Sequence, residues 1–174
     1  MTTDTSTGPR FAAITYARGA PVRQLLLTFA DKRRAEGLNV QGLVQEYVDG
    51  PDGERLGVDA IDITTGKRIP LSRPTTYEVD NKVCSLDLSK LTEATGVLRR
   101  ALDSGADVVV VERFGKTEKD GGGLADELLA LMASGIPTLI AVPEAEREAW
   151  SRFTGDLGDV LRCDQDELEK WWAV

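Results

Sequence analysis

Residues 14 to 25 have the outline of a phosphate-binding loop, with an apolar strand, a turn that contains glycine and proline, and then an amphipathic helix. The functional loop has the pattern Gly-x-x-x-x-Gly-Lys-Ser/Thr, in which the lysine reaches the phosphates and the hydroxyl binds Mg²⁺. On that frame, Tyr16 and Pro21 take the places of the two glycines. Val22 takes the place of the lysine, and Arg23 takes that of the hydroxyl residue. The segment therefore has the context of a phosphate site but lacks both chemically active side chains.

A helix N-terminus can attract an anion without a lysine, because its free backbone N–H groups carry about half a positive charge. Arg18 and Arg23 flank the turn and could add bidentate contacts to an oxyanion. Two interpretations stay open. The segment is either an anion site or an ordinary strand–helix connection with surface arginines, in which Pro21 is a common residue at a helix start.

A second candidate is the run Val108–Val111, which is followed by Glu112 and Arg113. Four apolar residues before an acid resemble a Walker B strand, whose acidic end orients Mg²⁺ and the attacking water. Glu112 stands where the usual aspartate would be. Arg113 stands where the catalytic glutamate would be, so a guanidinium replaces the candidate general base. An acid after a buried strand is common, and the pattern is informative here because it follows the loop at 16–23.

Apolar strands and amphipathic helices alternate along the chain and must position these two segments. A helix is expected over 22–36, and the β-branched run 108–111 is typical of a strand buried on both faces. Further helices are expected over 88–102, 124–134 and 144–153 and at the C-terminus, with strands over 11–15, 137–142 and 159–163. This alternation predicts an α/β fold with a mostly parallel sheet covered by helices on both faces. Ligands of such sheets bind at the carboxyl ends of the strands, here the loops after Thr15 and Val111.

The segment between the first two long helices predicts an inserted β-hairpin or meander. Strands are expected over 40–47, 58–63 and up to residue 71, and residues 72–86 are expected to be irregular. The polar residues 1–9 predict a disordered leader, followed by a single domain at 10–174. The leader lacks the apolar stretch of a signal peptide, which favours a cytoplasmic protein.

Composition excludes several classes of function. The net charge of −8 disfavours binding to nucleic acid or to an anionic membrane, so any anion site must be local. The chain has no histidine, which excludes imidazole base catalysis and most transition-metal sites. Cys84 and Cys163 give neither a disulfide framework nor a zinc spacing. Cys84 fits either a small buried apolar residue or, with Arg73 and Lys82 nearby, a partly activated thiol.

Three short motifs accompany the two candidate segments: Gly-Leu-Val-Gln at 42–45, Asp-Ile-Thr-Thr-Gly at 62–66 and Gly-Lys-Thr-Glu at 115–118. Their order resembles that of the small P-loop nucleoside-triphosphatases of the thermophile type. The chain is more similar still to an uncharacterised bacterial family related to them, with a degenerate P-loop, through Gly-Leu-x-Gln, Cys-x-Leu-Asp at 84–87 and Arg-Phe-Gly-Lys-x-Glu at 113–118. The resemblance covers roughly residues 11–172 and implies a P-loop NTPase-like fold. It also implies a link to oxyanions, because genes of that family often lie near genes for molybdate uptake or nitrogen fixation.

These observations predict a non-hydrolysing protein that binds a nucleotide, phosphate or a molybdate-type tetrahedral oxyanion. The residues expected to bind the anion are Tyr16, Ala17, Arg18, Gly19, Ala20, Arg23, Arg113 and Lys116. Lys116 would supply the charge that Val22 lacks, although a solvated loop lysine fits the sequence equally well. One alternative is an active nucleoside-triphosphatase, in which Glu112 binds Mg²⁺ and Lys116 or Arg113 stabilises the transition state. The other is a module without a ligand that acts through a protein partner or a homodimer surface.

Overall fold

The computed structural model describes residues 9–83 and 85–174. Nearly all of the predicted leader at 1–9 therefore lies outside the described residues, as does Cys84 with its two proposed roles. Among the described residues, no helix is both long enough and apolar enough to cross a membrane.

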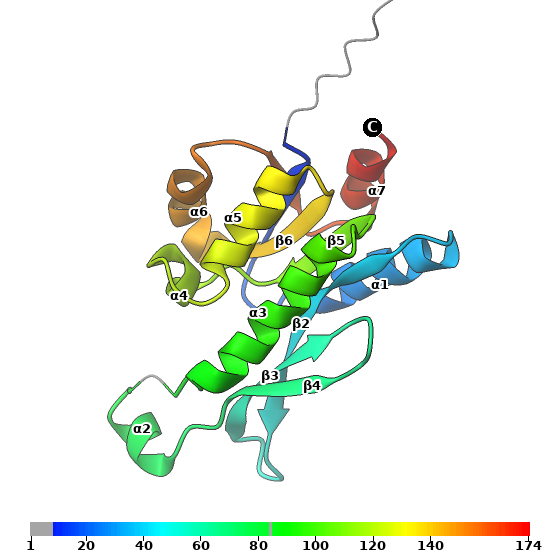
Figure 1. The fold of residues 1–174 in the computed structure, drawn as a ribbon. Helices are drawn as coiled ribbons and strands as arrows, with labels where there is room; N and C mark the ends of the chain where they lie inside the picture. The colour runs from blue at the N-terminus through cyan, green and yellow to red at the C-terminus, as the bar shows by residue number, and fades with distance from the viewer. Residues whose placement is uncertain (1–8, 84) are drawn as a thin grey trace, which may run out of the picture.

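One mixed sheet of seven strands organises the molecule (Figure 1). The strands are β1 (Phe11–Tyr16), β2 (Val40–Asp49), β3 (Arg55–Asp62), β4 (Arg68–Ser72), β5 (Val108–Glu112), β6 (Thr138–Pro143) and β7 (Asp159–Arg162). Their order across the sheet is β4-β3-β2-β5-β6-β1-β7. Across the sheet, the neighbouring pairs β2–β5, β5–β6, β6–β1 and β1–β7 are parallel. Strand β3 pairs antiparallel with both β2 and β4. The prediction of a mostly parallel sheet with an inserted hairpin is confirmed.

Helices cover both faces of the sheet, as its apolar central strands β5 and β6 require. Successive side chains of a strand point to opposite faces. Val109 and Val111 accordingly pack in a core with helices α3 (Leu88–Asp103), α5 (Ala125–Ser134) and α6 (Arg147–Thr154). Val108 and Val110 pack in a second core with α1 (Val22–Ala35) and α7 (Gln165–Ala173). All four valines are fully buried, as expected for a strand covered on both faces.

Two short helices lie outside the segments predicted to be helical. Helix α2 (Thr76–Asp80) lies within 72–86, and Figure 1 shows it apart from α5 and α6. A capping box stabilises its first turn, because Thr75 and Glu78 each accept a hydrogen bond from the other's backbone N–H. Helix α4 (Lys116–Lys119) lies in the loop after β5. Each is too short to show apolar periodicity, which is the signal that identified the longer helices.

Candidate functional site

The two segments singled out in the sequence lie at one edge of the sheet. The loop after β1 and the loop after β5 both leave the carboxyl ends of parallel strands, with β6 between those strands. A cleft of about 920 Å³ opens at this edge. Its lining residues are Tyr16, Ala17, Arg18, Gly19, Ala20, Pro21, Val22, Arg23, Gln24, Gln45, Tyr47, Arg55, Glu112, Arg113, Pro143, Glu144 and Ala145. The cleft thus brings together every predicted site residue except Lys116.

The loop from residue 17 to 21 is a tight turn into α1. The Ala20 N–H donates to the Ala17 carbonyl at 3.0 Å, and Gly19 has a φ of +86°, which few other residues adopt. Pro21 precedes the helix, and no side chain caps its N-terminus. Since the first N–H groups of a helix have no intrahelical acceptor, this end of α1 offers donors and partial positive charge to the cleft.

Val22, at the position of the P-loop lysine, is a core residue. Its side chain is 4% exposed and packs with Leu26 and Phe29 in the core beneath α1. The backbone position that would carry a lysine is therefore used to anchor the helix to the sheet. The positive charge of the cleft comes instead from four arginines: Arg18, Arg23, Arg55 and Arg113.

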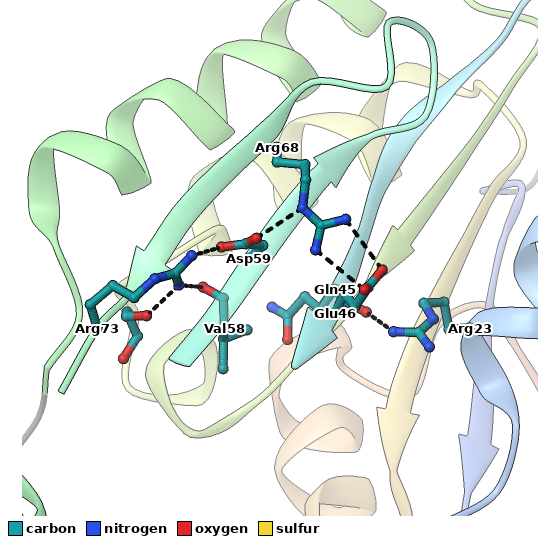
Figure 2. Close-up of polar contacts among 8 residues, drawn as sticks. Arg23, Gln45, Glu46, Val58, Asp59, Arg68 and Arg73 are labelled. Atoms are coloured by element: carbon teal, nitrogen blue, oxygen red, sulfur yellow. Dashed lines mark hydrogen bonds and ion pairs between the residues drawn. The ribbon is translucent and has the colours of Figure 1, made fainter. Parts of the chain in front are cut away.

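Arg23 and Glu112 are both hydrogen-bonded to the backbone of Gln45. Arg23 Nη1 donates to the Gln45 carbonyl oxygen at 3.0 Å, as Figure 2 shows. The Gln45 N–H donates to Glu112 Oε1 at 2.7 Å. Burial raises the pKa of Glu112, against the opposing effects of the Gln45 N–H and of the Arg23 and Arg113 charges. The carboxyl group is thus held in place but is costly to ionise.

Arg113 and Tyr16 face one another at the ends of β5 and β1. Burial lowers the pKa of Arg113, but the Tyr16 hydroxyl and nearby negative groups outweigh this effect and raise it overall. Burial also raises the pKa of Tyr16, although the neighbouring Arg113 opposes the shift. Arg113 therefore stays cationic and Tyr16 stays a neutral hydroxyl at physiological pH, so neither can act as a general base.

Lys116 lies exposed at the start of α4, beside a smaller pocket of about 200 Å³. That pocket shares Gln45, Glu112 and Arg113 with the main cleft but does not include the loop at 16–23. The motif residue Glu118 has a structural part here. Its carboxylate accepts hydrogen bonds from the N–H groups of Gly115 at 3.0 Å and Leu124 at 3.3 Å, which ties together both ends of the loop that contains α4.

Several lining residues were not predicted, among them Tyr47, Arg55 and Glu144. Tyr47 and Arg55 come from β2 and β3, and the Arg55 guanidinium carbon lies 3.5 Å from the Tyr47 ring centroid. Strands were predicted over 40–47 and 58–63, so Arg55 fell before the second one. The sequence gave no signal that these strands border the loop after β1. No cluster of three or more His, Cys, Asp or Glu side chains able to hold a metal ion is present in the described part of the chain.

Residues 11–171 match the family described as "Protein of unknown function (DUF2478)". The chain belongs to that family. It is also 37% identical over 163 residues to "Molybdenum import ATP-binding protein ModC 2" of Bradyrhizobium diazoefficiens. The match covers 94% of this chain but only 18% of that relative, so the chain spans less than a fifth of the relative's length. Membership of an uncharacterised family was predicted and is confirmed, and the similarity to an ATP-binding protein supports the P-loop NTPase-like character of the fold.

Proposed function

We propose that this DUF2478 protein binds a phosphate-bearing anion of nucleotide size in the 920 Å³ cleft and does not hydrolyse it. The observation that carries the proposal is the convergence of the uncapped α1 N-terminus with Arg18, Arg23 and Arg113 on one cleft. Guanidinium groups bind the oxygens of a phosphate through paired, charge-assisted hydrogen bonds. A helix N-terminus adds backbone donors to the same site.

The size of the cleft favours a nucleotide over a free tetrahedral oxyanion. Pockets for small organic ligands have volumes of about 300 to 1,000 Å³, and 920 Å³ lies within that range. Tyr16, Tyr47 and Pro143 add apolar and aromatic surface to the lining. Such surface suits the base or sugar of a nucleotide, whereas a lone phosphate or molybdate ion would use only the arginine end.

The side chains of the cleft argue against hydrolysis. A hydrolytic site needs a cation on the β/γ-phosphates and a group that positions the attacking water. Val22 is buried in the core, and Arg113 stands at the position of the catalytic acid. Loss of a single transition-state contact costs about 3 to 4 kcal/mol, or two to three powers of ten in rate. Binding without turnover is the activity that these residues support.

The name of the ModC 2 relative adds a second class of ligand to test. That protein is named for molybdenum import and ATP binding. Both nucleotide and molybdate are therefore candidate ligands of this chain, and both present anionic oxygens to arginine.

Thermal unfolding of the purified protein against a ligand panel tests the proposal. The panel holds ATP, ADP and GTP with and without Mg²⁺, then phosphate, sulfate, molybdate and tungstate. A ligand at 100 times its Kd adds about 2.7 kcal/mol of stability, which raises the Tm of a domain of this size by roughly 5 to 11 °C. We expect nucleotide to raise the Tm, and we expect no release of phosphate from the nucleotide. A shift with molybdate or tungstate alone would replace nucleotide with oxyanion as the ligand, and no shift with any anion would refute the proposal.

Paired variants test whether the cleft is the site. Arg18→Ala with Arg23→Ala should abolish the ligand-induced shift while the circular dichroism spectrum stays native. Arg34→Ala is the matched control, because Arg34 lies on the same helix but binds Asp31 and the Ile63 carbonyl instead of lining the cleft. An unchanged affinity in the double variant would show that the anion binds elsewhere.

A further inference from the structure

The residue at the magnesium position of this P-loop-like site is itself a cation. In P-loop proteins, Mg²⁺ is bound by the hydroxyl residue of the loop and by the acid at the end of the Walker B strand. The corresponding residues here are Arg23 and Glu112. Mg²⁺ requires oxygen ligands in a near-octahedral arrangement. A guanidinium has five donors and no acceptor, so Arg23 cannot be one of those ligands. The residues present do not fit magnesium.

Gln45 holds the Arg23 guanidinium close to the Glu112 carboxylate. The N–H and C=O of one residue in an extended strand point to the same side. Because Gln45 binds Arg23 through its C=O at 3.0 Å and Glu112 through its N–H at 2.7 Å, both side chains lie on that side of β2. The pairing of Leu43 with Val111, just before these residues, fixes the register. The positive charge thus sits beside the acid, where a P-loop protein would have its metal ion.

The charge of the cleft lining also favours a ligand without bound magnesium. Magnesium normally neutralises part of the negative charge of a nucleotide's phosphates. In this cleft, arginine side chains can supply that positive charge instead. The lining carries four arginines against the two carboxylates Glu112 and Glu144. Arg55 is paired with Asp49 at 3.0 Å, which leaves Arg18, Arg23 and Arg113 to set the charge of the cleft. A metal-free phosphate chain would meet a cleft with an excess of positive groups.

We propose that the Arg23 guanidinium takes the place of Mg²⁺ in this cleft, so that the protein binds the metal-free form of its phosphate ligand. This inference rests on the proposed function and specifies the chemical form of the ligand. Nucleotides in water that contains magnesium are largely metal-bound, so the protein would select the minor, free form. Added magnesium would then weaken binding by competing for the nucleotide.

Calorimetric titration of the full chain with ATP, in excess EDTA and in excess Mg²⁺, tests the inference. We expect ATP to bind more tightly in EDTA than with Mg²⁺. ATP binding that is as tight or tighter with Mg²⁺ would overturn the inference and leave the proposed function standing. If ATP binds under neither condition and no phosphate-bearing ligand of the panel raises the Tm, both proposals are refuted.

Two variants with opposite expected effects sharpen the test. Arg23→Ser restores a hydroxyl at the P-loop position and should weaken metal-free ATP binding about 10-fold or more, as loss of a charge-assisted hydrogen bond implies. Glu112→Gln keeps an acceptor for the Gln45 N–H but removes a negative charge, so it should tighten metal-free binding. Arg34→Ser, on the same helix but outside the cleft, is the control for loss of a positive charge. No effect of Arg23→Ser, or weaker binding in Glu112→Gln, would contradict the exchange of metal for guanidinium.

Discussion

The same substitution, glycine to alanine, should lower the stability of the fold at one position and raise it at another. Gly42 lies in β2 with a φ of +144°, and it pairs with Val110 of β5. An ideal Cβ at Gly42 would overlap the carbonyl oxygen of Val110. It would also lie 2.8 Å from the carbonyl carbon of Val110 and 2.9 Å from the Val110 backbone nitrogen. Gly96 lies in the exposed face of α3, and a Cβ there meets no atom within 4 Å. Gly42→Ala should therefore force β2 away from β5, whereas Gly96→Ala should fit without change.

The size of each effect follows from these contacts. A side chain at an unfavourable φ costs about 1 to 3 kcal/mol. Separation of the strands also weakens hydrogen bonds of the ladder, each worth roughly 0.5 to 1.5 kcal/mol. With two such bonds lost, the total is about 2 to 6 kcal/mol, a large part of the 5 to 15 kcal/mol typical of a whole domain. The corresponding fall in Tm is roughly 4 to 24 °C. Gly96→Ala should gain about 0.5 to 1 kcal/mol, because alanine is the better helix former.

Urea unfolding followed by circular dichroism measures both variants. The two substitutions restrict the unfolded chain to the same extent, so the difference between their unfolding free energies isolates the effect on the native state. The cleft should respond as well, since Gln45 follows Gly42 by three residues and its bond to Glu112 depends on the register of β2 against β5. If Gly42→Ala were no more destabilising than Gly96→Ala, the close approach of the two strands would not be a feature of the protein.

Three further predictions concern buried groups. Because burial raises the pKa of Glu112 above its ordinary 4.5, its ionisation costs stability as the pH rises past that value. Glu112→Gln should therefore gain stability over the parent above pH 4.5 but not below it, in urea unfolding at several pH values. Asp59 is 4% exposed, and its pKa is lowered because hydrogen bonds from Arg73 and Arg68 outweigh the effect of burial (Figure 2). Asp59→Asn should lower the free energy of unfolding by about 1 to 3 kcal/mol at neutral pH, discounted for the half-exposed arginines. The loss should shrink as the pH falls below 3.8. An unchanged loss at low pH would contradict this prediction. Leu98→Ala removes a fully buried side chain and should cost roughly 3 to 5 kcal/mol, and a cost under 1 kcal/mol would contradict the packing of α3.

The sequence by itself determined the main elements, because their apolar patterns are long. The stripe from Val22 to Ala30 is continuous over more than two turns, and α1 begins at the predicted residue. Val108–Val111 could be recognised as a strand covered on both faces because each of its side chains is apolar. The hairpin was recognisable from its turns. Helices α2 and α4 were missed, because one turn of helix is set by caps and by its surroundings instead of by periodicity.

The composition of the cleft needed the tertiary structure. The sequence indicated that the loops after β1 and β5 share an edge, since the ends of parallel strands do. Only the strand order, with β2 beside β5, decided that the Gln45 backbone joins Arg23 to Glu112. It also brought Tyr47 and Arg55 into the lining and left Lys116 beside the neighbouring pocket. Local patterns fix which residues form a strand, but the neighbours of that strand depend on contacts between residues far apart in the chain.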